Sequence, residues 1–291
     1  MSRSVVFVAE TLRMAAPYAA CGLAAVVGER AGVVNIALEG GLVVSGLAAA
    51  SIAVATGSAT LGLLGALVAG ALFAAFHGAL VVRGRVDAIV SGIALNVIAY
   101  AAARVALRVL YGSSSNSPKV PGFRDDVASP LARVLGDPVV LALALAVMIV
   151  VVVLARTRFG LHLRAAGESP DAARAAGVDV DRVRVLATAL AGAIGGLGGA
   201  HLVFDQRHFD PGMSGGRGFI ALAAVILGGW RPVPTALACL GFAALEATQI
   251  ALQDAVRVPP ELVQMVPYVA TILVLATVAR RARPPGGLGR L

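Results

Sequence analysis

Long apolar runs constrain this chain more than any other feature of its sequence. A helix that crosses the hydrocarbon core of a bilayer needs about 20 mostly apolar residues. Eight stretches have roughly that length, and they are Val5–Val27, Val33–Ala55, Thr60–Val82, Ala88–Leu110, Val139–Ala155, Val185–Phe204, Val233–Leu252 and Leu262–Ala279. The sequence therefore predicts an all-α polytopic membrane protein whose single domain spans residues 1–291.

The composition excludes an ordinary soluble domain. Hydrophobic residues make up 58% of the chain and charged residues only 14%, whereas about a quarter of the residues in soluble domains are charged. The net charge of +8 comes mostly from arginine, since Lys119 is the only lysine. A nucleic-acid partner would need a basic soluble face with stacking aromatic residues, and the sequence offers none. The first residues also lack the pattern of a removable signal peptide, so insertion is expected to depend on the spans themselves.

The hydrophilic stretches predict the orientation. Residues 156–184 contain six arginines and the tail at 280–291 contains four, whereas the loop at 111–137 balances three basic against three acidic residues. Because arginine accumulates in cytoplasmic loops, we expect a cytoplasmic coupling loop at 156–184, a cytoplasmic tail and an outward loop at 111–137. The loop and tail share one side only if Gly212–Trp230 also crosses, which predicts nine membrane segments and an N-terminus outside.

Two of the predicted segments are interrupted by glycine. Gly28–Gly41 and Gly212–Trp230 each place glycines directly before an apolar run, one in each half of the chain. Backbone groups freed by a broken helix are tolerated at membrane depth only inside protein or beside a water-filled cavity. We therefore expect two Gly-interrupted or re-entrant segments near the path of a solute.

Polar side chains within the apolar runs are the candidates for that path. An intramembrane carboxylate is costly and by default suggests function. The candidate pathway residues are Asn35, Glu39, Ser91, Asn96, Tyr100, Glu246 and Gln249. The alternatives are a pairing of Glu39 with Arg30 or Arg104, and helix–helix contact for the other polar groups. His77 and His201 are expected to be packed core residues.

A short helix is predicted within the coupling loop. Ser169 suits the N-cap, Pro170 the first helical position, Asp171 the helix dipole and Gly177 the left-handed end. A helix of two turns is too short to be stable alone, so it either docks on a partner or is a solvated connector. The candidate docking residues are Gly167, Glu168, Ser169, Pro170, Asp171, Ala172, Ala173, Arg174 and Gly177.

Three further patterns concern packing, metals and the outer surface. Two series of small residues at four-residue spacing predict close helix packing, and they are Gly62, Ala66, Gly70, Ala74 and Gly192, Gly196, Ala200. Cys21 and Cys239 lack the spacing of a metal or redox site, so no metal is expected. Asp205, Arg207, His208 and Asp210 form a polar cluster expected to face outward, as a contact for a binding protein or as a solvated loop.

Several motifs together resemble the permease family of binding-protein-dependent ATP-binding-cassette importers for branched-chain amino acids, ribose and nucleosides. The motifs are GERAGVVNIALEG at 28–40, RVDAIVSGIALN at 85–96, TRFGLHLRAAGESPDAARAAGVDVDRVR at 157–184, GRGFIALAAVILGGWRP at 216–232 and VPY at 266–268. They are most similar to the nucleoside and simple-sugar branch.

That resemblance implies a non-catalytic subunit in the plasma membrane with three partners: a second permease, a cytoplasmic ATPase and an extracytoplasmic solute-binding lipoprotein. ATP and Mg would belong to the ATPase, because this chain has no P-loop and no cofactor of its own is expected. The alternative function is an ion-coupled secondary transporter that depends on carboxylates such as Glu39 and Glu246. A membrane enzyme lacks support, since no nucleophile and base or metal-ligand set is evident.

Overall fold

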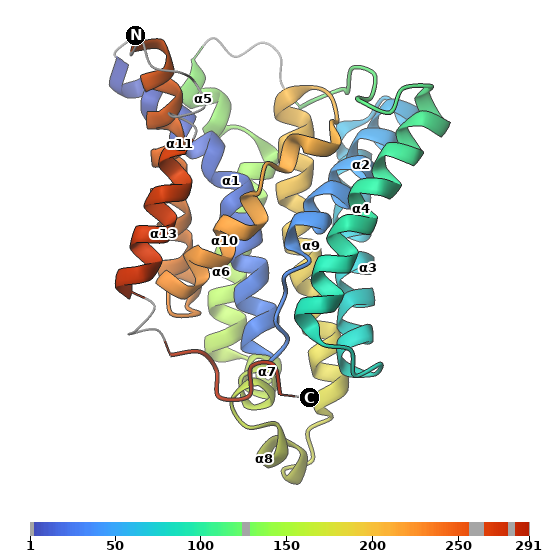
Figure 1. Cartoon of the computed structure of the whole chain (residues 1–291), viewed down its shortest axis with the longest axis vertical. Helices are drawn as coiled ribbons and strands as arrows, with labels where there is room; N and C mark the ends of the chain where they lie inside the picture. The colour runs from blue at the N-terminus through green and yellow to red at the C-terminus, as the bar shows by residue number, and fades with distance from the viewer. Residues whose placement is uncertain (1–2, 124–128, 256–264, 279–282, 291) are drawn as a thin grey trace.

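The chain forms a bundle of helices. The computed structural model describes residues 3–123, 129–255, 265–278 and 283–290. Within these ranges the regular elements are α1 (Arg3–Arg30), α2 (Leu38–Thr56), α3 (Ala59–Val82), α4 (Ala88–Tyr111), α5 (Pro130–Leu135), α6 (Pro138–Arg156), α7 (Arg158–Glu168), α8 (Pro170–Ala175), α9 (Val180–Gln206), the 3-10 helix η1 (Pro211–Ser214), α10 (Arg217–Leu227), α11 (Pro232–Ala255) and α13 (Val266–Val278) (Figure 1).

Seven of the described helices are long and apolar enough to cross a membrane, namely α1, α2, α3, α4, α6, α9 and α11. The predicted all-α polytopic fold is thus confirmed, whereas the count of nine segments is not. Within Gly212–Trp230 only the 11 residues of α10 form an apolar helix. The predicted span Leu262–Ala279 lies partly outside the described residues. Its described part contains α13, which has 13 residues.

The bundle has two clearly different ends. In Figure 1 the N-terminus, α5 and the last turn of α9 lie at the upper end, whereas α7, α8 and the C-terminal residues lie at the lower end. These are the two ends that the sequence assigns to the outside and to the cytoplasm. We call them the outer and inner ends below.

Close packing of α3 against α9 holds the centre of the bundle together. A Cβ added to Gly70 would collide with the Gly192 backbone, and one added to Gly196 would collide with the Ala66 carbonyl. Two helix backbones in van der Waals contact gain dispersion and interhelical contacts that lipid cannot replace. The predicted close packing through small residues is therefore confirmed, and the structure shows that the two series face each other.

The first interruption is narrower than predicted. α1 continues through Gly28 to Arg30, and α2 begins at Leu38 rather than Val33, so only residues 31–37 leave the helical path. Gly32 adopts a φ of +96°, which explains one glycine of this segment. Gly40 lies inside α2, where a Cβ would lie 2.9 Å from Asn96 Oδ1. A glycine is needed at position 40 because α2 and α4 lie close together there, and not because the helix is interrupted.

The second interruption surrounds α10. η1 is followed by Gly215 and Gly216, whose φ angles are +55° and +78°, and α10 ends at a turn in which Gly229 and Trp230 also have positive φ. The sequence predicts a Gly-interrupted or re-entrant segment here, and the structure has a short apolar helix with non-helical backbone at both ends. In Figure 1 α10 runs obliquely beside α1 and α13.

The coupling loop differs in detail from the prediction. It begins with α7, which the sequence did not predict and which is capped by Thr157 Oγ1 accepting from Gly160 N at 3.0 Å. α8 has only six residues, and Ser169 occupies its N-cap position without a side-chain hydrogen bond. Gly177 has the expected left-handed backbone, with a φ of +82°.

Candidate functional site

The carboxylate of Glu39 joins the two interrupted segments. Glu39 lies in the first turn of α2 and is 1% exposed. Its Oε1 accepts from the Tyr100 hydroxyl at 3.0 Å and from Gly216 N at 2.8 Å, and its Oε2 accepts from Gly218 N at 2.8 Å. Both glycines belong to the N-terminal turn of α10. A carboxylate there satisfies orphan N–H groups and complements the helix dipole.

Neither arginine suggested for Glu39 is its partner. Arg30 Nε instead donates to the Trp230 carbonyl at 2.8 Å, and Arg104 is exposed on α4. Gly218 explains why α10 can approach so closely, since a Cβ there would lie 2.7 Å from Glu39 N and 2.8 Å from Oε2. Ser214 completes the arrangement, with its Oγ 2.6 Å from the Tyr100 hydroxyl. We call Glu39, Tyr100, Ser214, Gly216 and Gly218 the Glu39 cluster.

Two of the other candidates on α4 hold the first interruption in place. Asn96 donates through Nδ2 to Ile36 O at 2.9 Å and accepts Gly40 N at 2.7 Å through Oδ1. Ser91 Oγ lies 3.1 Å from His77 Nδ1, while His77 Nε2 lies 3.1 Å from Val34 O. These groups replace the helical hydrogen bonds that residues 31–37 lack. His77 is buried, as predicted.

Glu246 also holds the start of α10, through a side chain. Its Oε1 pairs with the Arg217 guanidinium at 2.5 Å, and Arg217 lies over the Tyr18 ring at 5.9 Å. The pair is mostly buried, with exposed fractions of 19% and 16% for the two side chains. Gln249, one turn further along α11, is half-buried. The structure therefore brings Glu39 and Glu246 to the same turn of α10 and leaves Gln249 apart from them.

Asn35 lies inside the first interruption and is 2% exposed. Among the described residues, its Oδ1 has no hydrogen-bond partner. A buried amide oxygen without a partner is unusual and calls for an explanation. Among the candidates in the described ranges, Glu246 shares this feature, because its Oε2 is also buried without a partner.

A second buried carboxylate, Glu29, was missed by the sequence interpretation. It is 5% exposed, and its Oε2 accepts from Trp230 Nε1 at 2.5 Å. Trp230 follows the end of α10, so Glu29 and Glu39 hold the two ends of one short helix. The available signal was the position of Glu29 directly before the interruption, together with the only tryptophan directly after Gly228 and Gly229.

At the inner end, a compact junction connects the coupling loop to the first interruption. The buried Arg184 donates through Nε to Ala31 O at 3.1 Å and through a terminal nitrogen to Ala166 O at 3.3 Å. Gly167 packs so tightly that a Cβ would collide with the Arg30 carbonyl. Gly167 and Ala173 are buried, so they support the loop, whereas Asp171, Ala172 and Ala176 are exposed.

The C-terminal residues 283–290 lie across this junction. Gly287 N donates to Gly167 O at 2.7 Å, and Gly289 N donates to Gly32 O at 3.1 Å. Gly286 N donates to Glu168 Oε2 at 3.1 Å. The tail therefore bonds both to the coupling loop and to the first interruption.

No group of three or more His, Cys, Asp or Glu in the described ranges is placed to hold a metal ion. The polar groups above instead bond to backbone at the breaks between helices. Such an arrangement positions broken helices and shows no paired nucleophile and base.

Comparison with known proteins decides the family. The family described as the permease component of the branched-chain amino acid transport system matches residues 7–275. This chain belongs to that family. It is a non-catalytic, multi-pass permease subunit of an ATP-binding-cassette importer in the cell membrane.

Individual relatives match over most of their length. The chain is 33% identical to the guanosine ABC transporter permease protein NupQ of Bacillus subtilis, over 98% of this chain and 95% of that one. It is 32% identical to the nucleoside ABC transporter permease protein NupC of Lactococcus lactis, over 96% and 94%. Identity to the glucose ABC transporter permease protein TsgB13 of Haloferax volcanii is 29%, over 92% and 76%. No solved structure matches.

Proposed function

We propose that this permease carries nucleosides into the cell, with simple sugars as the second solute class. The observation that carries the proposal is near full-length similarity to two permeases named for guanosine and for nucleosides. Two permeases named for glucose are 30% and 29% identical and match 89% and 76% of their own length, against 95% and 94% for the two nucleoside permeases. Neutral hydrogen-bonding groups and aromatic side chains near the interruptions suit a hydroxylated solute with an aromatic base.

The proposed solute path passes the Glu39 cluster. Tyr100 is half-buried and Phe219 on α10 is 49% exposed, so both have surface that a passing solute can touch. Weak contacts in series suit transport, because a tight site would trap the solute. The proposed pathway residues remain Asn35, Glu39, Ser91, Asn96, Tyr100, Glu246 and Gln249, among which Ser91 and Asn96 act through the backbone that they hold.

The same proposal gives nine membrane segments. It adds to the seven long helices one crossing made by Gly212–Trp230, which contains α10, and one made by α13. α10 is then the helical part of a broken crossing, and its ends are held by Glu29 and Glu39. An ion-coupled transporter is less well supported, because both oxygens of Glu39 already accept hydrogen bonds from protein groups.

α8 is the proposed docking site for a cytoplasmic ATPase, which would bind the ATP and Mg. α8 projects at the inner end in Figure 1 and exposes Asp171, Ala172, Ala175 and Ala176. A short helix with small exposed side chains fits a groove on a partner. A second permease and an extracytoplasmic solute-binding lipoprotein complete the proposed importer.

The inner junction gives α8 a route to the solute path. α8 directly follows α7, whose Gly167 packs against the Arg30 carbonyl. Arg184, in α9, donates a hydrogen bond to Ala31 O. Movement of the coupling loop therefore acts on residues 31–37, which end directly before Glu39. We propose this contact sequence as the coupling route.

Replacement of Gly177 by leucine tests the docking assignment. In the assembled importer in proteoliposomes, we expect Gly177→Leu to abolish solute-stimulated ATP hydrolysis while membrane insertion stays intact. Gly57→Leu is the matched control, because Gly57 also has a positive φ, of +68°, and neither glycine has an atom within 4 Å of an added Cβ. Both variants carry similar backbone strain, so equal stimulation in the two would refute docking at α8.

A further inference from the structure

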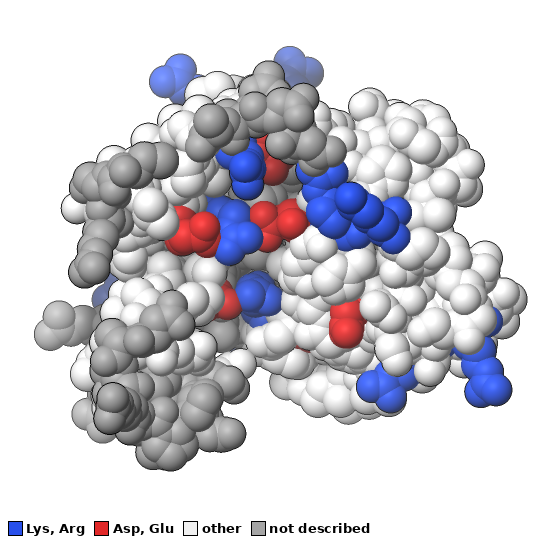
Figure 2. All heavy atoms as spheres, turned by 90° about the horizontal axis from the view of Figure 1, so that it is seen from above, with Lys and Arg blue, Asp and Glu red and all other residues white. Residues whose placement is uncertain are grey.

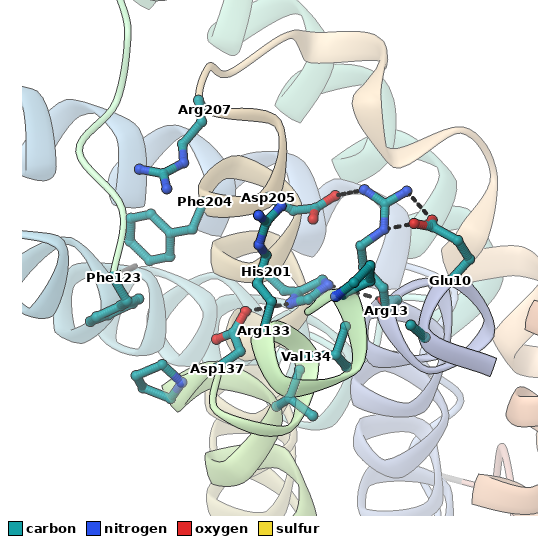
Figure 3. Close-up of a pocket in the computed structure, with 14 residues that line it drawn as sticks. Glu10, Arg13, Phe123, Arg133, Val134, Asp137, His201, Phe204, Asp205 and Arg207 are labelled. Atoms are coloured by element: carbon teal, nitrogen blue, oxygen red, sulfur yellow. Dashed lines mark hydrogen bonds and ion pairs between the residues drawn. The ribbon is translucent and has the colours of Figure 1, made fainter. Parts of the chain in front are cut away.

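A polar pocket lies at the outer end, away from the Glu39 cluster. It has a volume of about 380 Å³ and is formed by the first turns of α1, by α5, by the start of α6 and by the last turns of α9 (Figure 3). Figure 2, seen from this end, shows basic and acidic side chains gathered around a hollow near the centre of the face. A volume of several hundred Å³ is typical of sites for small molecules.

The formal charges that line this pocket cancel. Its charged members are Glu10, Arg13, Arg133, Asp137, Asp205 and Arg207. Arg13 bridges two of the acids, with hydrogen bonds of 2.9 Å to Glu10 and 2.9 Å to Asp205. Three arginines against three acids give the lining no net formal charge to attract an ionic ligand. The lining therefore favours a neutral polar molecule.

His201 and Asp137 present two acceptors side by side in the pocket. His201 Nε2 lies 2.9 Å from Arg13 O, and since a carbonyl can only accept, Nε2 carries the hydrogen of the neutral ring. Nδ1 is then an acceptor. It is buried and has no hydrogen-bond partner among the described residues.

Asp137 provides the neighbouring acceptor. Its Oδ1 is used by Val139 N at 2.8 Å, as the cap of α6. Its Oδ2 lies 3.8 Å from His201 Nδ1, too far for a direct hydrogen bond. Two acceptors at this separation can each take one hydrogen from a pair of adjacent hydroxyl groups. A buried polar atom without a partner costs free energy that such a ligand would recover.

An aromatic wall closes one side of the pocket. Phe123 and Phe204 pack edge to face, with ring centroids 5.1 Å apart. In Figure 3 they lie beside His201 and Asp137, across from the Arg13 ion pairs. The pocket thus combines two hydroxyl acceptors with an apolar surface for a ring.

We propose that this pocket is an outer binding site for a neutral solute that carries a vicinal diol, as the ribose of a nucleoside does. Oδ2 of Asp137 accepts from the 2′-hydroxyl of the ribose, and Nδ1 of His201 accepts from the 3′-hydroxyl. The choice of ligand rests on the proposed function, and the site lets the permease itself read the sugar before the solute reaches the Glu39 cluster.

Asp137→Asn in the full chain tests the site, with uridine and 2′-deoxyuridine as probes. Binding to the detergent-purified permease is titrated by saturation-transfer NMR, without any partner subunit. We expect uridine to bind wild-type protein about tenfold or more tightly than 2′-deoxyuridine, since one charge-assisted hydrogen bond is lost. Asp137→Asn should weaken uridine by a similar factor and leave 2′-deoxyuridine nearly unchanged, because changes that remove one shared contact are not additive.

Asp87→Asn is the matched control. Asp87 caps α4 as Asp137 caps α6, through Oδ1 to backbone N–H groups, and asparagine caps a helix equally well. It should bind both probes as wild type does.

Three outcomes would overturn the outer site. These are no binding of uridine to wild-type protein, equal binding of the two probes, and an equal loss of both probes in Asp137→Asn. If His201 and Asp137 only form a pH-dependent pair with each other and bind no diol, the first of these outcomes, no binding of uridine, is expected. Nucleoside uptake by the assembled importer is measured separately. If uptake persists while one of these binding outcomes is found, the outer site is refuted and the proposed function still holds.

Discussion

Replacement of Glu39 by glutamine should release the start of α10 without changing the size of the side chain. Glutamine keeps an oxygen for Gly216 N and the Tyr100 hydroxyl, but its amide nitrogen then faces Gly218 N, a second donor. The charge-assisted bond to Gly218 N, which is 2.8 Å long, is lost. Losing such a bond and leaving a buried donor unpaired costs about 1.5–3 kcal/mol. That is roughly a 10- to 150-fold shift toward a state in which α10 is detached.

A buried thiol on α10 can measure this shift. Ile220 is 5% exposed on α10, so Ile220→Cys reacts with a thiol reagent mainly when α10 opens. Cys21 and Cys239 are both 0% exposed and give little background. We expect Glu39→Gln to raise the modification rate at position 220 by about 10- to 150-fold, given the free energy above.

Glu10→Gln in the same cysteine background is the control. The Glu10 side chain is 39% exposed and, within the described part of the chain, pairs with Arg13 of the same helix, so its replacement should leave the rate at position 220 unchanged. The protein that retains only Cys21 and Cys239 corrects for background. A rate in Glu39→Gln within twofold of wild type would show that Glu39 does not anchor α10.

Two further substitutions test the contacts at the ends of α10. Gly218→Ala places a Cβ 2.8 Å from Glu39 Oε2 and should raise the rate at position 220, whereas Gly241→Ala, in α11 with open space around it, should not; equal rates would refute the close approach. Trp230→Phe removes the donor to Glu29 and leaves a buried carboxylate oxygen underbonded, so the denaturation temperature in detergent should fall by an amount that reflects about 1–3 kcal/mol. An unchanged denaturation temperature would mean that the Glu29 bond does not stabilise the turn.

The sequence predicts the helices well because lipid imposes one requirement on each of them. About 20 apolar residues are needed to cross, so runs such as Thr60–Val82 and Ala88–Leu110 agree with α3 and α4 to within one residue at each end. The same requirement makes Glu39 conspicuous in the sequence. The groups that donate hydrogen bonds to Glu39 could not be predicted, because Gly216 lies 177 residues further along the chain. Local sequence patterns do not show which distant residues come into contact.

Glu29 shows where local interpretation fails for a different reason. It stands beside Arg30 at the end of an apolar run, a position typical of a solvated loop. Only the fold buries it, by bringing Trp230 against it. The glycines of Gly28–Gly41 are a similar case, because Gly32 serves a turn and Gly40 serves contact with α4. Sequence alone cannot distinguish these two uses of glycine.

The two carboxylates also determine how α10 can move. Glu29 lies in the last turn of α1 and Glu39 in the first turn of α2, so they lie on either side of residues 31–37 and bind opposite ends of α10. A shift of the first interruption must therefore either carry α10 with it or break at least one buried charge-assisted hydrogen bond. Carrying α10 preserves those bonds but must move or break the Arg217–Glu246 ion pair, which connects α10 to α11. The junction at Arg184 and Gly167 contacts Ala31 and Gly32 from the inner end, so the proposed coupling route leads to α10.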